Sequence, residues 1–402
     1  MNNRLVITNY EKSGNTGVLM THFIQQKPVN IQLYSKEDTG LLGNIYIGKV
    51  KNIVSNIQAA FIDIGDGVNC YYSLKESQQP FFVNEKKDNT MHINDEILVQ
   101  VEREAIKQKA PCVTSKLSLT GKYMVLITND HGINVSRKIA KSEHGRLKSW
   151  LTPMLEDSYG FIVRTNAAAA DKEALMKEAM VLIQRYKHIY QIAKTRTCYS
   201  LIEEALNPCL SFLRDANDLQ YDEIVTDDKK LHEEILNYFQ QVEPDKMDTV
   251  RLYEDDLLAL SKLYSLDTVI NDTLKKQIWL KSGGFLVIEQ TEACVVIDVN
   301  TGKYSGNKSK KDTLNKINQE AAIELAKQVR IRNLSGIILV DFINTEEEDT
   351  KELLNLLCRE LRKDPVETRF IDMTALQIVE ITRKKVRKSF TEQWTEFLGG
   401  RN

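Results

Sequence analysis

The chain has 402 residues, and at about 150 residues per domain this length predicts two to four domains. Apolar residues make up 42% and charged residues 27%, a composition that predicts folded cores and excludes a disordered chain. Lys and Arg total 54 against 56 Asp and Glu, so the net charge of −2 excludes a uniformly basic nucleic-acid coat protein but allows a local basic groove.

The first residues and the cysteines predict a cytoplasmic protein. The opening MNNRLVI lacks the charged segment and apolar run of a signal peptide, and no apolar run approaches the roughly 18 residues needed to span a bilayer. The six cysteines are scattered and form no CxxC pair, which favours reduced thiols and disfavours a structural zinc site.

Short strands dominate the first 120 residues. Strand-like pieces fill residues 1–38, and three longer ones follow at 44–50, 59–65 and 96–102. The turn signals Asp66-Gly67 and Asn94-Asp95 separate them. Several short strands within about 75 residues predict a small barrel, most simply of the OB type.

Helices become more frequent in the middle of the chain. After strands at the start of 121–214, residues 169–192 carry apolar side chains at helical spacing. These are Leu175, Met180, Leu182, Ile183 and Tyr186. Further helices are predicted at 229–241 and 255–265.

From about Lys276 the pattern predicts a hairpin at Gly283-Gly284 and then a strand–helix–strand unit. The helix should begin at Asp312 as N-cap and bury one apolar stripe. The second strand covers 337–343, and another helix is expected over 347–362. A crossover of this kind lays its two strands parallel.

Two aspartates interrupt these apolar strands. Asp298 and Asp341 each lie near the C-terminal end of their strand, the edge where open α/β sheets place their sites. If the strands are neighbours, the carboxylates converge, and a hard divalent cation would compensate their charge. Asn300 could add a ligand or orient a phosphate. Alternatively, both aspartates cap loops at the strand ends.

Long segments of the chain resemble the ribonuclease E/G family. The C-terminal motifs are VVIDVNTG (295–302) and NQEAAIELAKQVRIRNLSGIILVDFI (318–343). GNIYIGKV (43–50) and QAAFIDIG (58–65) are similar to the family's S1-type OB domain, and GFIVRT (160–165) is similar to its sensor segment. The resemblance extends to about Arg387.

This resemblance implies a multidomain α/β and α+β fold. An S1-like OB barrel (39–120) would be inserted in an RNase H-like subdomain (1–38 plus 215–275). A 5′-sensor subdomain (121–214) and a β-α-β, DNase I-like catalytic domain (276–402) would follow. The implied reaction is Mg²⁺-dependent endonucleolytic cleavage of single-stranded RNA, leaving a 5′-phosphate on the downstream product.

The resemblance also assigns roles to residues. Asp298 and Asp341 would hold Mg²⁺, with Asn300 supporting the site. The remaining positions match RNA contacts of the family. They are Phe61, Tyr71 and Lys109 in the OB clamp, and Arg164, Thr165 and Arg369 around the RNA 5′-monophosphate. Base stacking and a guanidinium–phosphate pair are the physical contacts implied.

Alternative interpretations exist for several of these positions. Phe61 could be a core aromatic, and Arg369, in a segment that departs from the family pattern, could be a surface arginine. The lysine-rich stretches Lys303–Lys311 and 382–388 could follow the phosphate backbone or could be solvated faces.

The C-terminal tail departs from the family. It lacks the CxxC pair through which family members share zinc between subunits, so we expect a monomer or a zinc-independent dimer. Phe390, Trp394 and Leu398 form a helical stripe that would pack within the chain or against a second copy.

The sequence thus favours a magnesium-dependent endoribonuclease of rRNA maturation or mRNA decay. A catalytically idle RNA-binding protein is the first alternative, and the intact Asp298, Asn300 and Asp341 argue against it. An unrelated metal-dependent phosphotransferase is the second. The chain has no GxxxxGK[ST] loop, which disfavours the nucleotide-driven forms of that chemistry.

Overall fold

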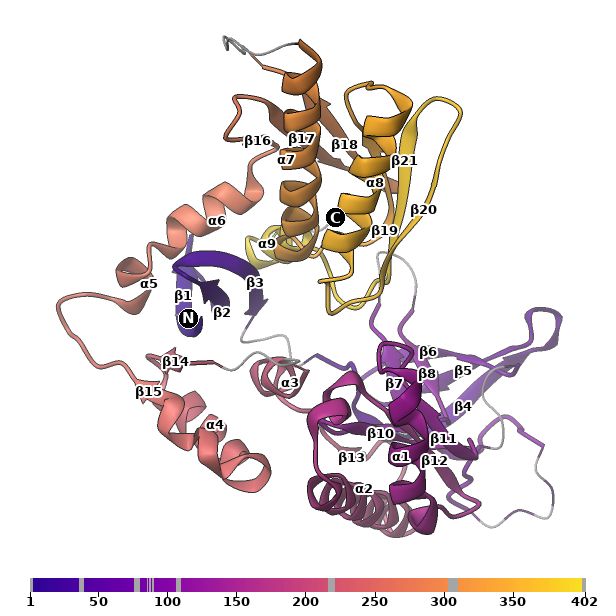
Figure 1. Ribbon diagram of the computed structural model, residues 1–402. Helices are drawn as coiled ribbons and strands as arrows, with labels where there is room; N and C mark the ends of the chain where they lie inside the picture. The colour runs from indigo at the N-terminus through magenta and orange to yellow at the C-terminus, as the bar shows by residue number, and fades with distance from the viewer. Residues whose placement is uncertain are drawn as a thin grey trace. The chain divides into compact units, whose positions relative to one another are not determined.

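The computed structural model describes residues 3–35, 40–75, 80–84, 86, 88, 90–105, 110–215, 221–302 and 310–399. The chain divides into two compact units, one of Thr39–Asp218 and one of Met1–Asp38 with Leu219–Asn402. Each unit combines helices and sheets, so the fold is mixed α/β (Figure 1).

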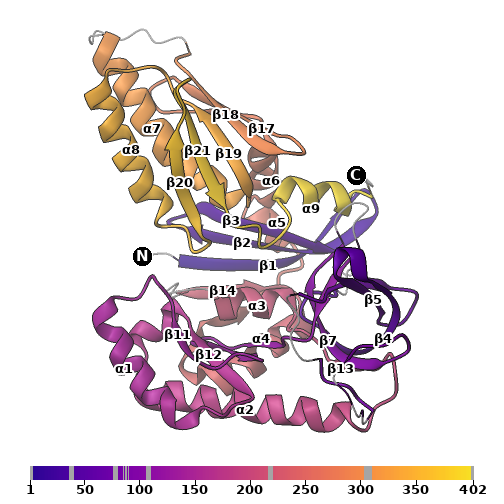
Figure 2. The same cartoon turned by 90° about the vertical axis from the view of Figure 1, so that its right-hand side faces the viewer.

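The first part of unit Thr39–Asp218 is a closed barrel. Within the described residues, five strands run in the order β4-β5-β6-β8-β7, and β7 pairs back onto β4 (Figure 2). The strands are β4 (Ile45–Val54), β5 (Ala59–Asp63), β6 (Asn69–Ser73), β7 (Glu96–Arg103) and β8 (Cys112–Thr114). A Cβ on Gly48 would lie 2.4 Å from Ile62, so this position of β4 requires glycine where the strands pack closely. The barrel is consistent with the predicted OB type.

The second part of this unit is a smaller sheet ordered β11-β12-β10-β9, with helices packed on it. Its strands are β9 (Ser118–Thr120), β10 (Met124–Thr128), β11 (Gly132–Val135) and β12 (Tyr159–Val163). Its helices are α1 (Lys141–Leu151) and α2 (Lys172–Ala193), with short turns η2 (Thr152–Met154) and η3 (Thr165–Ala169). The unit also contains η1 (Ser55–Ile57), β13 (Leu201–Glu203) and α3 (Pro208–Asp215).

Helix α2 confirms the predicted helix but shifts its buried face. Asp171 caps it by accepting the N–H of Ala174, which explains why the helix starts three residues later than 169. Met180, expected on the apolar stripe, is 52% exposed. The buried stripe runs through Leu175, Ala179, Leu182 and Ile189 instead.

In the other unit, the N-terminal strands join later ones in the order β15-β14-β1-β2-β3. β14 is parallel to both β1 and β15, and the remaining pairs are antiparallel. The strands are β1 (Asn3–Lys12), β2 (Asn15–Ile24), β3 (Lys27–Ser35), β14 (Glu223–Thr226) and β15 (Val250–Leu252). The accompanying helices are α4 (Lys229–Val242), η4 (Pro244–Thr249), α5 (Leu260–Leu263) and α6 (Leu266–Leu274).

The helix predicted at 255–265 is wrong in its extent. The carboxylate of Asp255 accepts the N–H groups of Leu257 and Leu258, which holds a turn where the helix was expected to begin. Ser265 has φ 50°, and this left-handed residue separates α5 from α6. The apolar spacing of the segment is therefore divided between two short helices.

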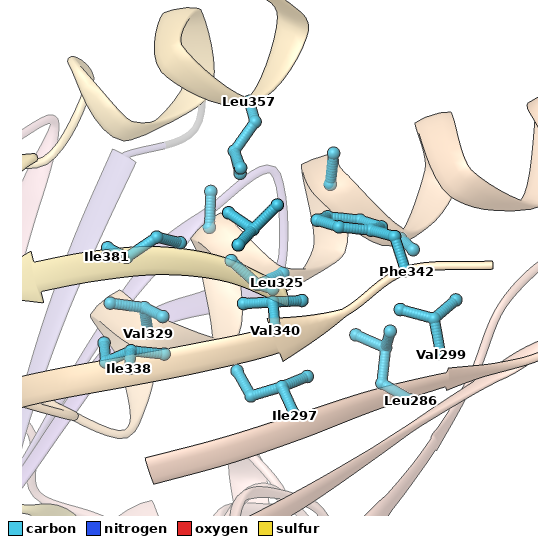
Figure 3. Packing of buried hydrophobic residues seen from close by; sticks show 14 of the residues in the cluster. Leu286, Ile297, Val299, Leu325, Val329, Ile338, Val340, Phe342, Leu357 and Ile381 are labelled. Atoms are coloured by element: carbon cyan, nitrogen blue, oxygen red, sulfur yellow. The ribbon is translucent and has the colours of Figure 1, made fainter. Parts of the chain in front are cut away.

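The C-terminal sheet is ordered β16-β17-β18-β19-β21-β20. It consists of β16 (Gln277–Trp279), β17 (Phe285–Gln290), β18 (Cys294–Asn300), β19 (Gly336–Asp341), β20 (Thr368–Met373) and β21 (Ile378–Arg383). Helices α7 (Lys310–Ile331) and α8 (Glu347–Leu361) lie side by side on one face (Figures 1 and 2). Ile297 and Val340 of the strands point toward Leu325 and Leu357 of these helices (Figure 3).

Helix α7 begins earlier than predicted. Asp312 was expected as its N-cap but lies inside the first turn, because the helix already includes Lys310. A carboxylate in this turn still interacts favourably with the helix dipole. Helix α8 ends one residue before its predicted boundary, and its start is confirmed.

The tail forms α9 (Phe390–Phe397), which starts with a capping box between Ser389 and Glu392. Phe390 and Phe397 are buried in the core that includes β1 and β3. The Trp394 ring lies 6.2 Å from that of Tyr10. Packing of the tail within its own chain is confirmed, while Leu398 at the end of the stripe is 41% exposed.

Candidate active site

Asp298 and Asp341 are paired across two neighbouring parallel strands. The register of β18 against β19 joins Ile297 to Val340 and Asp298 to Asp341. The predicted arrangement of neighbouring parallel strands linked by a helix is therefore confirmed. Because paired residues of adjacent strands point to the same side, both carboxylates belong to one face of the sheet.

The alternation of β18 determines which face this is. Val295, Ile297 and Val299 are buried against the helices, whereas Val296 and Asp298 between them are exposed. Asp341 is likewise exposed beside the buried Val340. The two aspartates thus lie on the face opposite α7 and α8.

Asn300 lies on the same face as Asp298, two residues further along β18. Its side-chain Nδ2 donates a hydrogen bond of 2.6 Å to Asp298 Oδ2. This bond restricts the Asp298 carboxylate to one orientation. Asn300 therefore fits the role of a positioning residue for Asp298.

The donor set suits a hard divalent cation. Among the described residues neither carboxylate forms an ion pair, and no group of three or more His, Cys, Asp or Glu residues is arranged to hold a metal. Magnesium is commonly bound by one or two carboxylates, with water and substrate phosphate completing its coordination. Two exposed carboxylates on paired residues fit this magnesium coordination better than they fit structural zinc, which is enclosed by four protein ligands.

Asn318 is a buried polar residue behind this site that sequence reasoning missed. From α7, its Nδ2 donates to the Ile343 carbonyl at 2.7 Å, and its Oδ1 accepts the Ile343 N–H at 3.1 Å. These bonds fix the backbone just after Asp341. The available signal was a polar residue, Asn318, next to the apolar stripe of this helix.

In the barrel, Phe61 and Tyr71 are directly paired between β5 and β6. Their rings lie 6.3 Å apart and nearly perpendicular. Neither belongs to the barrel core, which contains Ala60, Ile62 and Tyr72 from the same strands. The interpretation of Phe61 as a core aromatic is wrong, because its side chain points to the outer face of the barrel.

A cavity of about 310 Å³ begins beside Tyr71. Ser73, Glu102, Arg103, Thr114 and Lys116 are among the residues that line it, so it carries cationic, hydroxyl and carboxylate groups. Lys116 also pairs with Asp130 at 3.1 Å. Lys109, the third predicted member of the clamp, lies outside the described residues.

Arg164 and Thr165 follow the end of β12. Thr165 Oγ1 and Ser136 Oγ are 3.2 Å apart, and Ser136 follows β11, the parallel neighbour of β12. Both residues therefore lie at the C-terminal end of parallel strands, a usual location for ligand sites. Ser136 was not predicted, and its sequence context contains no signal for it.

The Arg164 guanidinium is held by two acceptors. Nη1 donates to the Gly121 carbonyl at 2.6 Å and Nη2 to Asp215 at 2.9 Å. Asp215 also accepts two bonds from Arg214. Burial alone would raise the pKa of Asp215, but the charges and hydrogen bonds of Arg214 and Arg164 hold that pKa below its usual value.

Glu178 supports the loop that presents Gly121. Its carboxylate accepts the backbone N–H groups of Lys122, Tyr123 and Met124. Burial raises the pKa of Glu178, against the effect of these three bonds. Sequence reasoning found neither Glu178 nor Asp215, because each acts on residues more than 40 positions away.

Arg369 belongs to the other unit, on β20. Its side chain is 58% exposed and pairs with Glu367. Of the two lysine-rich stretches, 303–309 lies outside the described residues. In the second, Arg383 is 4% exposed and its Nε pairs with Asp364 at 2.8 Å, so this residue of the stretch faces the interior and does not follow a phosphate backbone.

No helix in the described ranges is long and apolar enough to cross a bilayer.

Comparisons with known proteins place the chain among ribonucleases. A model of the ribonuclease E/G family matches residues 118–386. Ribonuclease G of Haemophilus influenzae is 31% identical over 376 residues, which cover 90% of this chain and 76% of that protein. Ribonuclease G of Escherichia coli K12 is 32% identical, covering 87% and 74%. Ribonuclease E of a Synechocystis strain is 30% identical, covering 87% and 53%.

Proposed function

Because the chain belongs to the ribonuclease E/G family, we propose that it is an endoribonuclease that cleaves single-stranded RNA with Mg²⁺. The observation that carries the proposal is the in-register pairing of Asp298 with Asp341 on an exposed sheet face. We further propose that it acts on rRNA precursors or mRNA in the cytoplasm, as a monomer or a dimer without a zinc link.

In this reaction Asp298 and Asp341 would hold the cation, and Asn300 would keep the Asp298 carboxylate oriented through its 2.6 Å bond. When bound there, Mg²⁺ lowers the pKa of water and neutralises charge on the scissile phosphate. The chain then needs no side-chain nucleophile of its own. Asn318 would hold the backbone after Asp341 in place while substrate binds.

The other predicted residues would bind RNA around this chemistry. Phe61 and Tyr71 offer aromatic faces on the outside of the barrel, where bases could stack. Arg164 would bind a 5′-monophosphate with Thr165, oriented by Asp215. In this proposal Lys109 acts with Phe61 and Tyr71, and Arg369 is the third residue for the 5′-monophosphate.

We also propose a role for each sheet, on the basis of the family to which the chain belongs. The barrel would be the S1-like RNA-binding domain, and the sheet of β9–β12 the 5′ sensor. The sheet of β1–β3, β14 and β15 would be the RNase H-like subdomain, and the C-terminal sheet the DNase I-like catalytic domain. The strand orders in each sheet support this division.

The test uses Asp298→Asn and Asp341→Asn with a 5′-monophosphorylated single-stranded RNA. Each should lower cleavage in Mg²⁺ by at least about a thousandfold, because one of two ligand charges is removed, while RNA binding and the melting temperature stay near wild type. Asp372→Asn is the matched control, since it changes an exposed aspartate of the same sheet on β20. It should cleave normally.

Three results would contradict the proposal. Wild-type protein that binds RNA but does not cut it would indicate an idle RNA-binding protein. Wild-type cleavage by either aspartate variant would place the site elsewhere. Cleavage that persists in EDTA would remove the metal from the reaction.

A further inference from the structure

Two aromatic residues lie beside the candidate site and have no role in the function described so far. Trp279 on β16 is 65% exposed. It pairs with Phe285 on β17, and the two rings are 5.2 Å apart with a 58° angle between their planes. An indole this exposed on a sheet leaves a large apolar surface in contact with water.

The register connects this pair to the carboxylates. Phe285 is the partner of Asn300 across β17 and β18, and Asn300 donates to Asp298. Paired strands are about 5 Å apart, and diagonal neighbours on one face about 7–8 Å. The Trp279–Phe285 pair therefore borders the face that carries Asp298 and Asp341.

The pair does not belong to the helix-side core. The sequence neighbours of the pair face that core instead, since Leu280 and Leu286 belong to it and Ile278 packs against it. Trp279 instead lies over backbone, since a Cβ built on Gly302 would come within 3.6 Å of its ring. Gly302 has φ 61° and approaches the Gly283 carbonyl so closely that any side chain there would collide with it.

We propose that Trp279, supported from the side by Phe285, stacks on a nucleobase of the RNA next to the scissile phosphate. This inference rests on the proposed function. Every base has a flat π-face, so such stacking would position the strand at the carboxylates without selecting a sequence. The exposed Lys281, two residues along, adds positive charge where the adjoining phosphate would pass.

The first measurement is RNA binding in EDTA, detected by fluorescence anisotropy. It needs neither metal nor cleavage. Trp279→Ala should weaken binding of a short single-stranded RNA about tenfold, and Trp279→Phe should restore most of it. Ile337→Ala is the matched control, because Ile337 is 55% exposed on the same face of β19 but lies four residues before Asp341. It should bind like wild type.

The second measurement locates the contact. Single abasic nucleotides are placed in turn along an RNA with one cleavage site, and single-turnover rates are measured in Mg²⁺. Wild-type protein should slow about tenfold when the nucleotide beside the scissile phosphate lacks its base. Trp279→Ala should be slow with the intact RNA and lose no further rate at that position.

The outcomes separate this inference from the proposed function. If the wild type binds RNA but does not cleave it, the endoribonuclease proposal fails, and the binding series alone decides on stacking. If Trp279→Ala binds like wild type and keeps the same abasic profile, stacking is overturned. If instead it only converts a dimer to a monomer in sedimentation, the aromatic pair is a protein–protein contact and the inference is likewise overturned.

Discussion

Arg164→Ala should remove the preference for a 5′-monophosphate while leaving cleavage of other RNA nearly unchanged. The guanidinium is already held by Gly121 and Asp215, so its binding geometry is set before a ligand arrives. A hydrogen bond to a charged group contributes about 1.5–3 kcal/mol, which corresponds to roughly 10- to 150-fold. The ratio of rates on 5′-monophosphorylated and 5′-hydroxyl RNA should fall by about that factor.

The cost of this substitution to stability should be small. Asp215 keeps its two bonds from Arg214 at 3.0 and 3.2 Å when Arg164 is removed, so no carboxylate is left without a partner. The Arg164 side chain is 21% exposed, and partly solvated ion pairs contribute little. We expect a loss of about 1 kcal/mol in the free energy of unfolding, measured by urea denaturation.

Arg185→Ala is the matched control for this prediction. Arg185 lies on α2 in the same unit, and its side chain is 32% exposed. It forms a bidentate ion pair with Glu203. Its removal should have a similar small cost to stability and no effect on the 5′-end preference. Equal losses on monophosphorylated, triphosphorylated and hydroxyl RNA for Arg164→Ala would refute the reasoning, since Arg164 would then support the fold or general binding.

Three further predictions concern the barrel, the pH dependence of stability and the metal. Phe61→Ala and Tyr71→Ala should each weaken RNA binding by roughly 1–3 kcal/mol in a titration. Ile57→Ala, which removes an exposed apolar side chain from η1 between β4 and β5, should not. Burial lowers the pKa of His22 to about 4 in the folded protein. As the pH falls below 6.5, His22 is therefore protonated in the unfolded chain but not in the folded one. This difference should lower the free energy of unfolding by about 1.4 kcal/mol per pH unit between pH 6.5 and 4. A urea series in which His22→Gln shows the same slope would contradict this. EDTA should stop cleavage without changing the sedimentation coefficient. About half a zinc per chain, together with dissociation by EDTA, would overturn the proposal of an assembly without a zinc link.

The pairing of the two aspartates was predictable because it depends on local patterns. Two apolar strands joined by a long helix have few arrangements, and a parallel neighbouring pair is the common one. Each aspartate is placed by its position in an alternating or apolar run, so no distant contact had to be guessed. The same holds for the small barrel, which follows from several short strands with turn residues between them.

What could not be predicted depends on pairs far apart in the sequence. Arg383 sits in a run of cations that looks like a solvated surface, yet it is buried against Asp364, Asn333 and Leu334. Nothing near Arg164 indicates that Asp215 holds it. At 255–265 the apolar spacing predicted one helix, but the local bonds of Asp255 stabilised a turn that periodicity does not detect.

One strand, β18, carries the core and the proposed chemistry on alternate residues. Ile297 and Val299 hold the sheet against the helices, while Asp298 and Asn300 face outward. Because the outward residues make few packing contacts, their loss should abolish activity with little effect on stability. The exposed Val296 and Trp279 on the same face are apolar although neither takes part in the helix-side core. A purely structural sheet would favour polar residues there, so their presence beside the carboxylates is better explained by a substrate that covers this face.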